Sequence, residues 1–394
     1  NKDKKVLNVP HLRFPEFSGE WEETTLGKIS EITKGSGISK DQLSEQGSPC
    51  ILYGELYTKY NSEVIGVVYS RTELESSSLV KSKANDVIIP CSGETAIDIS
   101  TARCVPFNNI LLGGDLNIIR LKHDDGGFFA YQLNGARKKD IARVAQGVSV
   151  VHLYGENLKH IRVYHPVIEE QKKITRLLSL IDERIATQNK VIEDLKLLKS
   201  AIIERAYRNR SYHPCRIGDV IEQISERNKD KSIDMVLSVS NKQGFINQSE
   251  QFEDRIIASE DTSNYKIVHK NDFAYNPARI NVGSIARLTT IDTGIVSPMY
   301  ICFRVKNGVA TEYMEHFFST SYFFYEMQKR LEGSVRQCLS FESICNIPIY
   351  IPSSEEQHTI GKKISVLLDK IDIETHYHCK LVEQKHYLLR QMFI

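Results

Sequence analysis

The sequence lacks the features that mark secreted, membrane-spanning or metal-binding proteins. Its eight cysteines form no CxxC pair and no zinc-finger spacing, and scattered thiols are typical of a reduced, cytosolic protein. No run approaches the ~20 apolar residues of a membrane span, and the polar start contains no signal peptide. A formal net charge of +1 shows no overall basicity, although it permits a local basic face. We expect a soluble intracellular chain. Its first residue, Asn1 in place of Met, suggests a trimmed or incomplete start.

Catalytic and cofactor motifs are also missing. "YNPAR" (Tyr275–Arg279) lacks the second proline and the aromatic residue of an adenine methyltransferase loop, and no glycine-rich cofactor loop accompanies it. "TKGSGISK" (Thr33–Lys40) does not fit GxxxxGK[ST], which leaves contact with a phosphate backbone as the alternative for this loop. In "HYHC", His376 and Cys379 can share a helix face, but a solvated surface is the simpler interpretation. We expect no catalytic residue and no metal site.

What the chain does contain is a long internal repeat. "YHPVIEEQKKI" begins at Tyr164 and "YIPSSEEQHTI" at Tyr350, 186 positions later. The match holds this offset without gaps from Gly147/Gly333 to the end of the chain, which chance similarity of two helices would not do. Upstream it fades, although "KANDVIIP" still lies opposite "HKNDFAYN" at the same offset. The sequence therefore indicates two units, 20–207 and 214–393, each with a divergent front and a similar back.

Each back predicts a long helix with an apolar seam. Residues in alternating steps of four and three are mostly Ile and Leu, which is a heptad pattern. The predicted seam residues are Ile174, Leu178, Ile181, Ile185, Ile192, Leu195, Ile202, Ile360, Ile364, Leu367, Ile371, Leu381 and Leu388. Polar residues interrupt both seams at equivalent positions, Gln188/Glu374 and Lys199/Lys385. Because neither helix can bury its stripe alone, we expect the two to pair as an antiparallel coiled coil.

The fronts combine short apolar strands, turn residues and helical stretches, which predicts an α+β fold. We expect two pseudo-twofold-related α/β domains separated by the paired helices. The predicted boundaries are an arm at 1–19, a first domain at 20–152, a central repeat with its helix at 153–207, a linker at 208–214, a second domain at 215–338 and a distal repeat with its helix at 339–394.

Basic and amide side chains cluster in the fronts. Arg and Asn are suited to bidentate contacts with base edges, and Lys to phosphates, although a single such residue is usually only a solvated charge. The candidate DNA contacts are Lys34, Lys40, Arg103, Arg137, Lys138, Lys139, Arg143, Arg227, Lys229, Lys231, Asn276, Arg279, Asn281, Arg287 and Arg336.

The opening "VPHLRFPEFSGEWEETTLGKI" and the doubled motif resemble the specificity (S) subunits of type I restriction–modification systems, the HsdS family. The first copy of the motif falls on Leu153, Leu158, Ile161, Pro166, Glu169–Gln171 and Ile174, and the second on Leu339, Ile344, Ile347, Pro352, Glu355–Gln357 and Ile360. The resemblance covers essentially the whole chain.

The resemblance implies two target-recognition domains, each reading half of a split, asymmetric sequence in double-stranded DNA, with a gap set by the helices. It also implies docking of two methyltransferase (M) subunits and of restriction (R) subunits in the bacterial cytoplasm. S-adenosylmethionine would bind the methyltransferase subunit, and ATP and Mg the restriction subunit, so this chain would be non-catalytic by itself. The alternative is a coiled-coil scaffold that binds other proteins, and a further one is an enzyme that cuts or methylates DNA unaided.

Overall fold

A computed structural model describes residues 7–75, 77–241, 243–248, 261–333 and 337–394. The chain forms two compact units, one of Asn1–Lys190 with Thr375–Ile394 and one of Val191–Glu374. The boundaries predicted from the sequence keep each long helix with one repeat, whereas these units divide both helices. In the described part of the chain, no helix combines the length and apolar character needed to cross a membrane.

The first unit is an α+β domain built on two small sheets, with strand orders β2-β9-β5-β7 and β4-β3-β8. Its strands are β1 (Glu22–Thr25), β2 (Ser30–Lys34), β3 (Ser48–Ile51), β4 (Ser70–Thr72), β5 (Asp86–Pro90), β6 (Ser92–Gly93), β7 (Arg103–Val105), β8 (Leu111–Leu112), β9 (Leu116–Leu121), β10 (Val151–His152) and β11 (Arg162–His165). Its short helices are α1 (Leu26–Ile29), η1 (Lys40–Gln42), α2 (Glu55–Thr58), α3 (Ala96–Ile99), α4 (Gly126–Asn134), α5 (Lys138–Val144) and α6 (Gly155–Lys159).

The second unit repeats this plan, with strand orders β13-β20-β17-β18 and β15-β14-β19-β16. Its strands are β12 (His213–Arg216), β13 (Ile221–Ile224), β14 (Val236–Ser240), β15 (Gly244–Asn247), β16 (Lys266–His269), β17 (Phe273–Tyr275), β18 (Ile285–Arg287), β19 (Thr293–Val296), β20 (Ile301–Val305) and β21 (Pro348–Ile351). Its short helices are α8 (Ile217–Val220), η2 (Ile280–Val282), α10 (Thr311–Phe317), α11 (Ser321–Gln328) and α12 (Phe341–Cys345). The predicted mixed α and β content is therefore confirmed.

A buried carboxylate supports the first sheet at the same place in each unit. Asp86 accepts two hydrogen bonds from Arg120, at 2.8 and 2.7 Å. In the second unit Asp272 accepts two from Arg304, at 2.6 and 2.8 Å. The asparagine before each aspartate, Asn85 or Asn271, has a left-handed backbone conformation, with φ of 81° and 74°. Asn tolerates this conformation better than most residues. The faint upstream similarity in sequence thus reflects a shared turn and ion pair.

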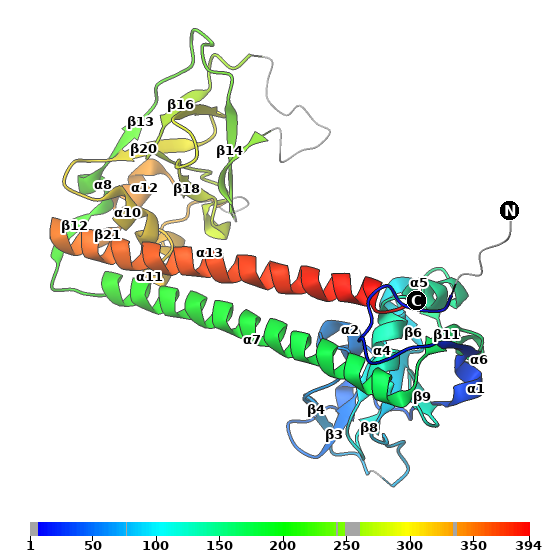
Figure 1. The fold of residues 1–394 in the computed structure, drawn as a ribbon. Helices are drawn as coiled ribbons and strands as arrows, with labels where there is room; N and C mark the ends of the chain where they lie inside the picture. Colours follow the sequence, from blue (N-terminus) through cyan, green and yellow to red (C-terminus); the bar gives the residue numbers. More distant parts are fainter. Residues whose placement is uncertain (1–6, 76, 242, 249–260, 334–336) are drawn as a thin grey trace, which may run out of the picture. The chain divides into compact units, whose positions relative to one another are not determined.

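Two long helices follow the repeated motif. Helix α7 (Ile168–Tyr207) has 40 residues and α13 (Ser354–Gln391) has 38. None of the thirteen predicted seam residues is exposed: they are buried or partly buried. In the first unit the end of α13 runs antiparallel beside the beginning of α7 (Figure 1), where Lys385 lies 2.6 Å from Asp182. In the second unit, Ile203 and Ile364 join the same core.

The glutamine of each EEQ motif joins a long helix to its domain. Gln171 Oε1 accepts a hydrogen bond from the N–H of Asp125, the residue that caps α4 (2.9 Å), and its amide donates to the carbonyl of Pro166 (2.9 Å). Gln357 repeats this arrangement with the N–H of Ala310 before α10 (2.6 Å) and the carbonyl of Pro352 (3.0 Å). The repeated motif is therefore an anchor for the start of each helix.

The glutamate before each glutamine differs between the copies. Glu170 is buried and receives two hydrogen bonds from Arg13, at 2.8 and 2.7 Å. This pair fixes the N-terminal arm to the start of α7. Glu356 instead accepts from the N–H and hydroxyl of Ser353 (3.2 and 3.0 Å), which is a local capping interaction.

A buried ion network fixes the end of α13 to the first unit. Lys385 Nζ lies 2.6 Å from Glu63 Oε2 and 2.6 Å from Asp182 Oδ1, and the Tyr131 hydroxyl donates to Asp182 Oδ2 at 2.7 Å. Burial, with the charge of Glu63, raises the pKa of Asp182 to about 6. Burial alone would raise the pKa of Glu63, but the charge and hydrogen bond of Lys385, the charge of Arg103 and a hydrogen bond with Asp182 together lower the pKa of that carboxyl.

The last residues of the chain complete the same core. Met392 and Phe393 are buried, and the Phe393 ring lies 5.2 Å from that of Phe128 and 6.3 Å from that of Trp21, measured between centroids.

Tyr207, 186 positions before Phe393, closes the second unit in the same way. Its ring centroid lies 4.5 Å from that of Tyr313 and 5.8 Å from that of Phe317. Within the described residues the ion network has no counterpart there, because Leu368 stands at the repeat position of Asp182.

Candidate nucleic-acid interface

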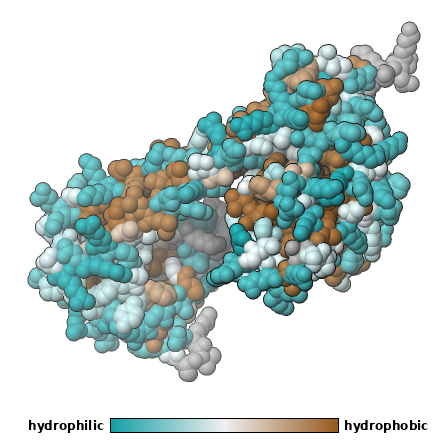
Figure 2. Space-filling model, turned by 90° about the horizontal axis from the view of Figure 1, so that it is seen from below, coloured by the Kyte–Doolittle hydropathy of each residue, from teal (hydrophilic) through white to brown (hydrophobic). Residues whose placement is uncertain are grey.

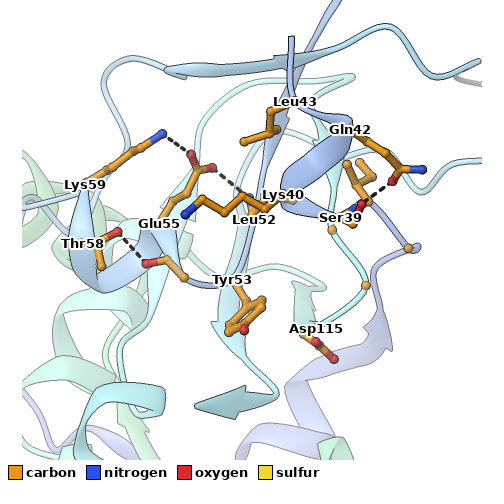
Figure 3. A pocket seen from close by; sticks show the side chains of 15 residues that line it. Ser39, Lys40, Gln42, Leu43, Leu52, Tyr53, Glu55, Thr58, Lys59 and Asp115 are labelled. Atoms are coloured by element: carbon orange, nitrogen blue, oxygen red, sulfur yellow. Dashed lines mark hydrogen bonds and ion pairs between the residues drawn. The ribbon is translucent and has the colours of Figure 1, made fainter. Parts of the chain in front are cut away.

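Three loops of the first unit enclose a cavity of about 1010 Å³ (Figure 3). They follow β2, β3 and β8, and parallel pairing of β3 with β8 brings their carboxyl ends to one edge. Glycines allow the loops to approach closely: a Cβ on Gly35 would lie only 2.0 Å from the carbonyl oxygen of Gly113. The "TKGSGISK" loop therefore forms one wall of a binding-sized depression.

The polar groups of this cavity divide into paired and free ones. Glu55 is paired, since its carboxylate accepts from Lys59 Nζ (2.6 Å) and from the N–H of Leu52 (2.9 Å) (Figure 3). The side chains of Lys40, Tyr53 and Asp115 line the same cavity and make no hydrogen bond or ion pair within the described residues. A cation, a phenol and a carboxylate can contact phosphates and the hydrogen-bonding edges of bases.

Lys34 and Lys40 have counterparts in the second unit. Strand β13 holds the place in its sheet that β2 holds in the first, and the segment after it carries Arg227, Lys229 and Lys231, all exposed. Arg227 donates to Asn264 Oδ1 (3.1 Å) and Lys231 lies 3.2 Å from Asp261. Each unit thus presents cations on the segment after the same strand.

Two predicted contacts are buried instead. Arg103 is 7% exposed, and its guanidinium donates to the carbonyl of Tyr60 at 2.6 Å. Asn276 is 8% exposed, and its side chain accepts from the N–H of Ala278 within a turn. Both side chains are therefore held within the fold rather than on an open surface, and contact of either with DNA stays a prediction.

Two other arginines are largely enclosed by partners. The Arg137 guanidinium stacks over Tyr164, 5.1 Å from the ring centroid, and donates to the carbonyl of Ile394. Arg287 lies between Glu312 and Glu315, 2.9 Å from the latter. Both support the fold, and contact of either with DNA stays a prediction.

The remaining predicted residues are spread over several surfaces. Lys139, Arg143 and Arg279 are exposed, whereas Lys138 and Asn281 are partly buried. Arg143 lies 3.0 Å from Asp140 on its own helix. Arg336 lies outside the described residues.

Sequence reasoning missed Tyr53 and Asp115. Each belongs to a short glycine-containing stretch directly after a strand, "LYGEL" and "LLGGDL". A strand followed by glycines was the available signal, but only the fold brings these two stretches beside Lys40.

Comparison with known proteins gives a consistent result. The family model described as type I restriction modification DNA specificity domain matches residues 18–197 and again 209–382. A MjaX type I restriction enzyme specificity subunit from Methanocaldococcus jannaschii is 23% identical over 63% of this chain and 62% of its own length. The MjaVIII specificity subunit from the same organism is 22% identical over 56% of this chain and 50% of its own length. The aligned region thus spans about three fifths and one half of these relatives.

Solved structures agree in fold. The crystal structure of a type I restriction–modification S subunit from M. genitalium has a TM-score of 0.61 at 16% identity and covers 98% of this chain and 99% of that one. A structure described in terms of complex assembly and conformational transition of the type I R-M system has a TM-score of 0.56 at 12% identity, with coverage of 95% and 97%. Since one specificity-domain model matches both halves over most of the length, the chain belongs to the type I restriction–modification DNA specificity family.

Proposed function

We propose that this chain reads an asymmetric, two-part sequence in double-stranded DNA, with one half-site for each unit. The observation that carries the proposal is a shared framework with different loops. The first sheets have the same strand order in both units. In each unit the glutamine of the EEQ motif, Gln171 or Gln357, anchors the long helix to the start of a short helix. The loops after β2 and β13 differ in sequence, and so would the bases that they contact.

The two long helices would set the gap between the half-sites. At ~1.5 Å per residue, 40 residues span roughly 60 Å, more than one ~34 Å turn of DNA. Pairing of α7 and α13 along their whole length as a coiled coil, and the pseudo-twofold relation of the units, stay predictions. In this proposal the loops determine the bases and the helices determine the spacing.

Each helix also offers a surface for a partner subunit. Figure 2 shows hydrophobic patches surrounded by hydrophilic residues on the face in view. On the helices, Leu180 and its repeat partner Val366 are 39% and 60% exposed, and Val191 and Tyr377 are 37% and 40% exposed. Apolar side chains exposed at equivalent positions support the docking of two methyltransferase subunits, one for each copy. Restriction subunits would join this assembly.

The chemistry would reside in those partners. S-adenosylmethionine would bind the methyltransferase subunit, and ATP and Mg the restriction subunit. The cavities of this chain then serve recognition, and the chain would be non-catalytic by itself.

The first test is genome-wide adenine methylation in cells that carry a matching methyltransferase subunit, with and without this gene. We expect one gapped, asymmetric motif that depends on the gene. Replacing residues 20–152 with the corresponding domain of another specificity subunit should change one half of the motif and leave the other half intact.

A motif that changes in both halves, or no gene-dependent motif at all, would contradict the proposal. The second result, with methyltransferase binding intact, would favour a coiled-coil scaffold. Methylation by the purified chain with S-adenosylmethionine alone would instead indicate an enzyme that acts unaided.

A further inference from the structure

A second cavity, of about 780 Å³, lies where the last turns of α13 meet the first unit. Its walls come from the loop that carries Glu63, from β7, from α5 and from α13. It is separate from the three loops around Lys40, and neither cavity shares a lining residue with the other.

Buried charges line this cavity. Arg103, Glu63 and Lys385 all face it, and each is less than a tenth exposed. Glu63 is matched by Lys385 at 2.6 Å. Arg103 uses its terminal nitrogens on the carbonyls of Ala102 (3.3 Å) and Tyr60 (2.6 Å), while its Nε is buried without a partner among the described residues. A buried guanidinium without a full set of acceptors is costly unless another acceptor completes it.

Among the side chains that line the cavity, cations outnumber carboxylates, and Asp182 beside Lys385 adds one further carboxylate. Lys138 and Arg390 add two cations to Arg103 and Lys385, whereas Asp98 is the further carboxylate beside Glu63. Lys138 reaches only the hydroxyl of Thr101, at 3.5 Å. Burial, and then the charge of Arg103, lower the pKa of Lys138. Like charges are thus held close together, and a bound anion would relieve their repulsion.

We infer that this cavity binds a phosphate group, with Lys138, Arg103 and Arg390 as its cationic contacts. These cations come from three different elements. A phosphate, whose oxygens point in several directions, can contact all three more easily than a planar carboxylate can. Arg forks and Lys point charges are the usual partners of phosphates. A phosphate held there would contact both α13 and the first domain, and so would strengthen their attachment.

The second unit provides an internal comparison. Ser321, the first residue of α11, corresponds to Lys138, the first residue of α5, and Glu204 stands at the repeat position of Arg390. Glu204 is engaged with the N–H and hydroxyl of Ser321, at 2.6 and 2.9 Å. Among the residues that the structure describes, this cationic set is found in the first unit, and we expect the phosphate site there.

The test is calorimetric titration of the full-length protein with inorganic phosphate and with pyrophosphate, at constant ionic strength set by NaCl. The wild type should bind one equivalent and gain thermal stability. Lys138→Met keeps the aliphatic stem but removes the charge, and it should weaken binding by about tenfold or more, as expected for loss of a charged hydrogen bond. Lys28→Met, which changes an exposed lysine on α1 outside the cavity, should bind like the wild type.

Absence of saturable binding, or equal affinity in Lys138→Met and wild type, would overturn the inference. Duplex DNA then identifies the source of the phosphate. If Lys138→Met also weakens DNA binding and reduces its salt dependence, the group is a backbone phosphate. If DNA binding is unchanged, the group comes from a free phosphate compound. This titration needs no DNA target, so its failure is distinguishable from failure of the methylation test.

Discussion

Gln171 makes three hydrogen bonds from a buried side chain, to the N–H of Asp125, the carboxylate of Asp124 and the carbonyl of Pro166. Gln171→Ala would leave the N–H of Asp125 and the carbonyl of Pro166 without this partner, whereas Asp124 would keep His165 at 3.0 Å. We therefore expect a loss of about 2–3 kcal/mol in the free energy of unfolding. Urea denaturation of the first unit, followed through its single tryptophan, Trp21, measures this. Glu169→Ala, at an exposed neighbouring position, is the control and should change little. Equal stability of the two variants would show that the glutamine is not an anchor.

His316 gives the second unit an acid sensitivity. Burial, and the positive charges of Lys199 and Arg287, lower its pKa to about 4, below the ~6.5 of an unfolded histidine. As pH falls from about 6.5 towards 4, the unfolded chain takes up this proton first, so folding stability decreases by about 1–2 kcal/mol. Denaturation at pH 7 and pH 5 should show this loss in the wild type.

His316→Gln should remove that part of the pH dependence, and His358→Gln, which changes an exposed histidine on α13, should not. An unchanged pH profile in His316→Gln would contradict the assignment.

At the level of secondary structure elements, the attachment of the end of α13 to the first unit depends on one lysine, Lys385. Lys385→Met would leave Glu63 and Asp182 buried without their cation, a loss of about 3–5 kcal/mol. Lys199→Met changes the repeat-equivalent residue, which makes no ion pair within the described residues, and should cost less than about 1 kcal/mol. Hydrogen exchange of residues 375–394 would show faster opening in the first variant. Similar exchange in both variants would mean that apolar packing alone holds the end of the helix.

The packing of α7 can be tested with two leucines on opposite faces of the helix. Leu178 is fully buried and Leu180 is 39% exposed. Leu178→Ala should cost about 2–5 kcal/mol in stability through the cavity that it leaves. Leu180→Ala should leave stability nearly unchanged, and an effect on methyltransferase binding there would support the docking surface. Thermal unfolding and a pull-down with that subunit separate the two roles.

Local sequence patterns predicted the long helices well, but they did not predict which arginines are buried. The heptad spacing identified the sides of α7 and α13 that are turned from solvent, because that periodicity is a property of the chain itself. The lysines at equivalent positions, Lys199 and Lys385, showed that the apolar seam of each helix is interrupted by a polar residue at the same point. They did not show that Lys385 pairs with Glu63, 322 residues away in sequence. The burial of Arg103 was missed for the same reason, since it depends on partners that only the fold brings together.

For the whole molecule, DNA binding should depend on the exposed lysines of the strand-following loops. Replacing Lys40 in the first unit, or Lys229 in the second, with Met should weaken binding similarly for all sequences, and each should reduce the salt slope by about one. Fluorescence anisotropy across a range of salt concentrations measures both effects. Lys362→Met, on the exposed surface of α13, is the control. A slope that responds equally to all three replacements would place the DNA elsewhere.

The closure of the first unit by residues 375–394 has a consequence for the order of events on the ribosome. Domains generally fold as they emerge, beginning with the N-terminal one. Here Trp21 and Phe128 are made early, but their partner Phe393 is the next-to-last residue of this sequence. The second unit, completed by Tyr207 and the residues up to Glu374, contains its whole core sooner. Of the two units, the one whose first residues are translated earlier is therefore the one whose core is completed later.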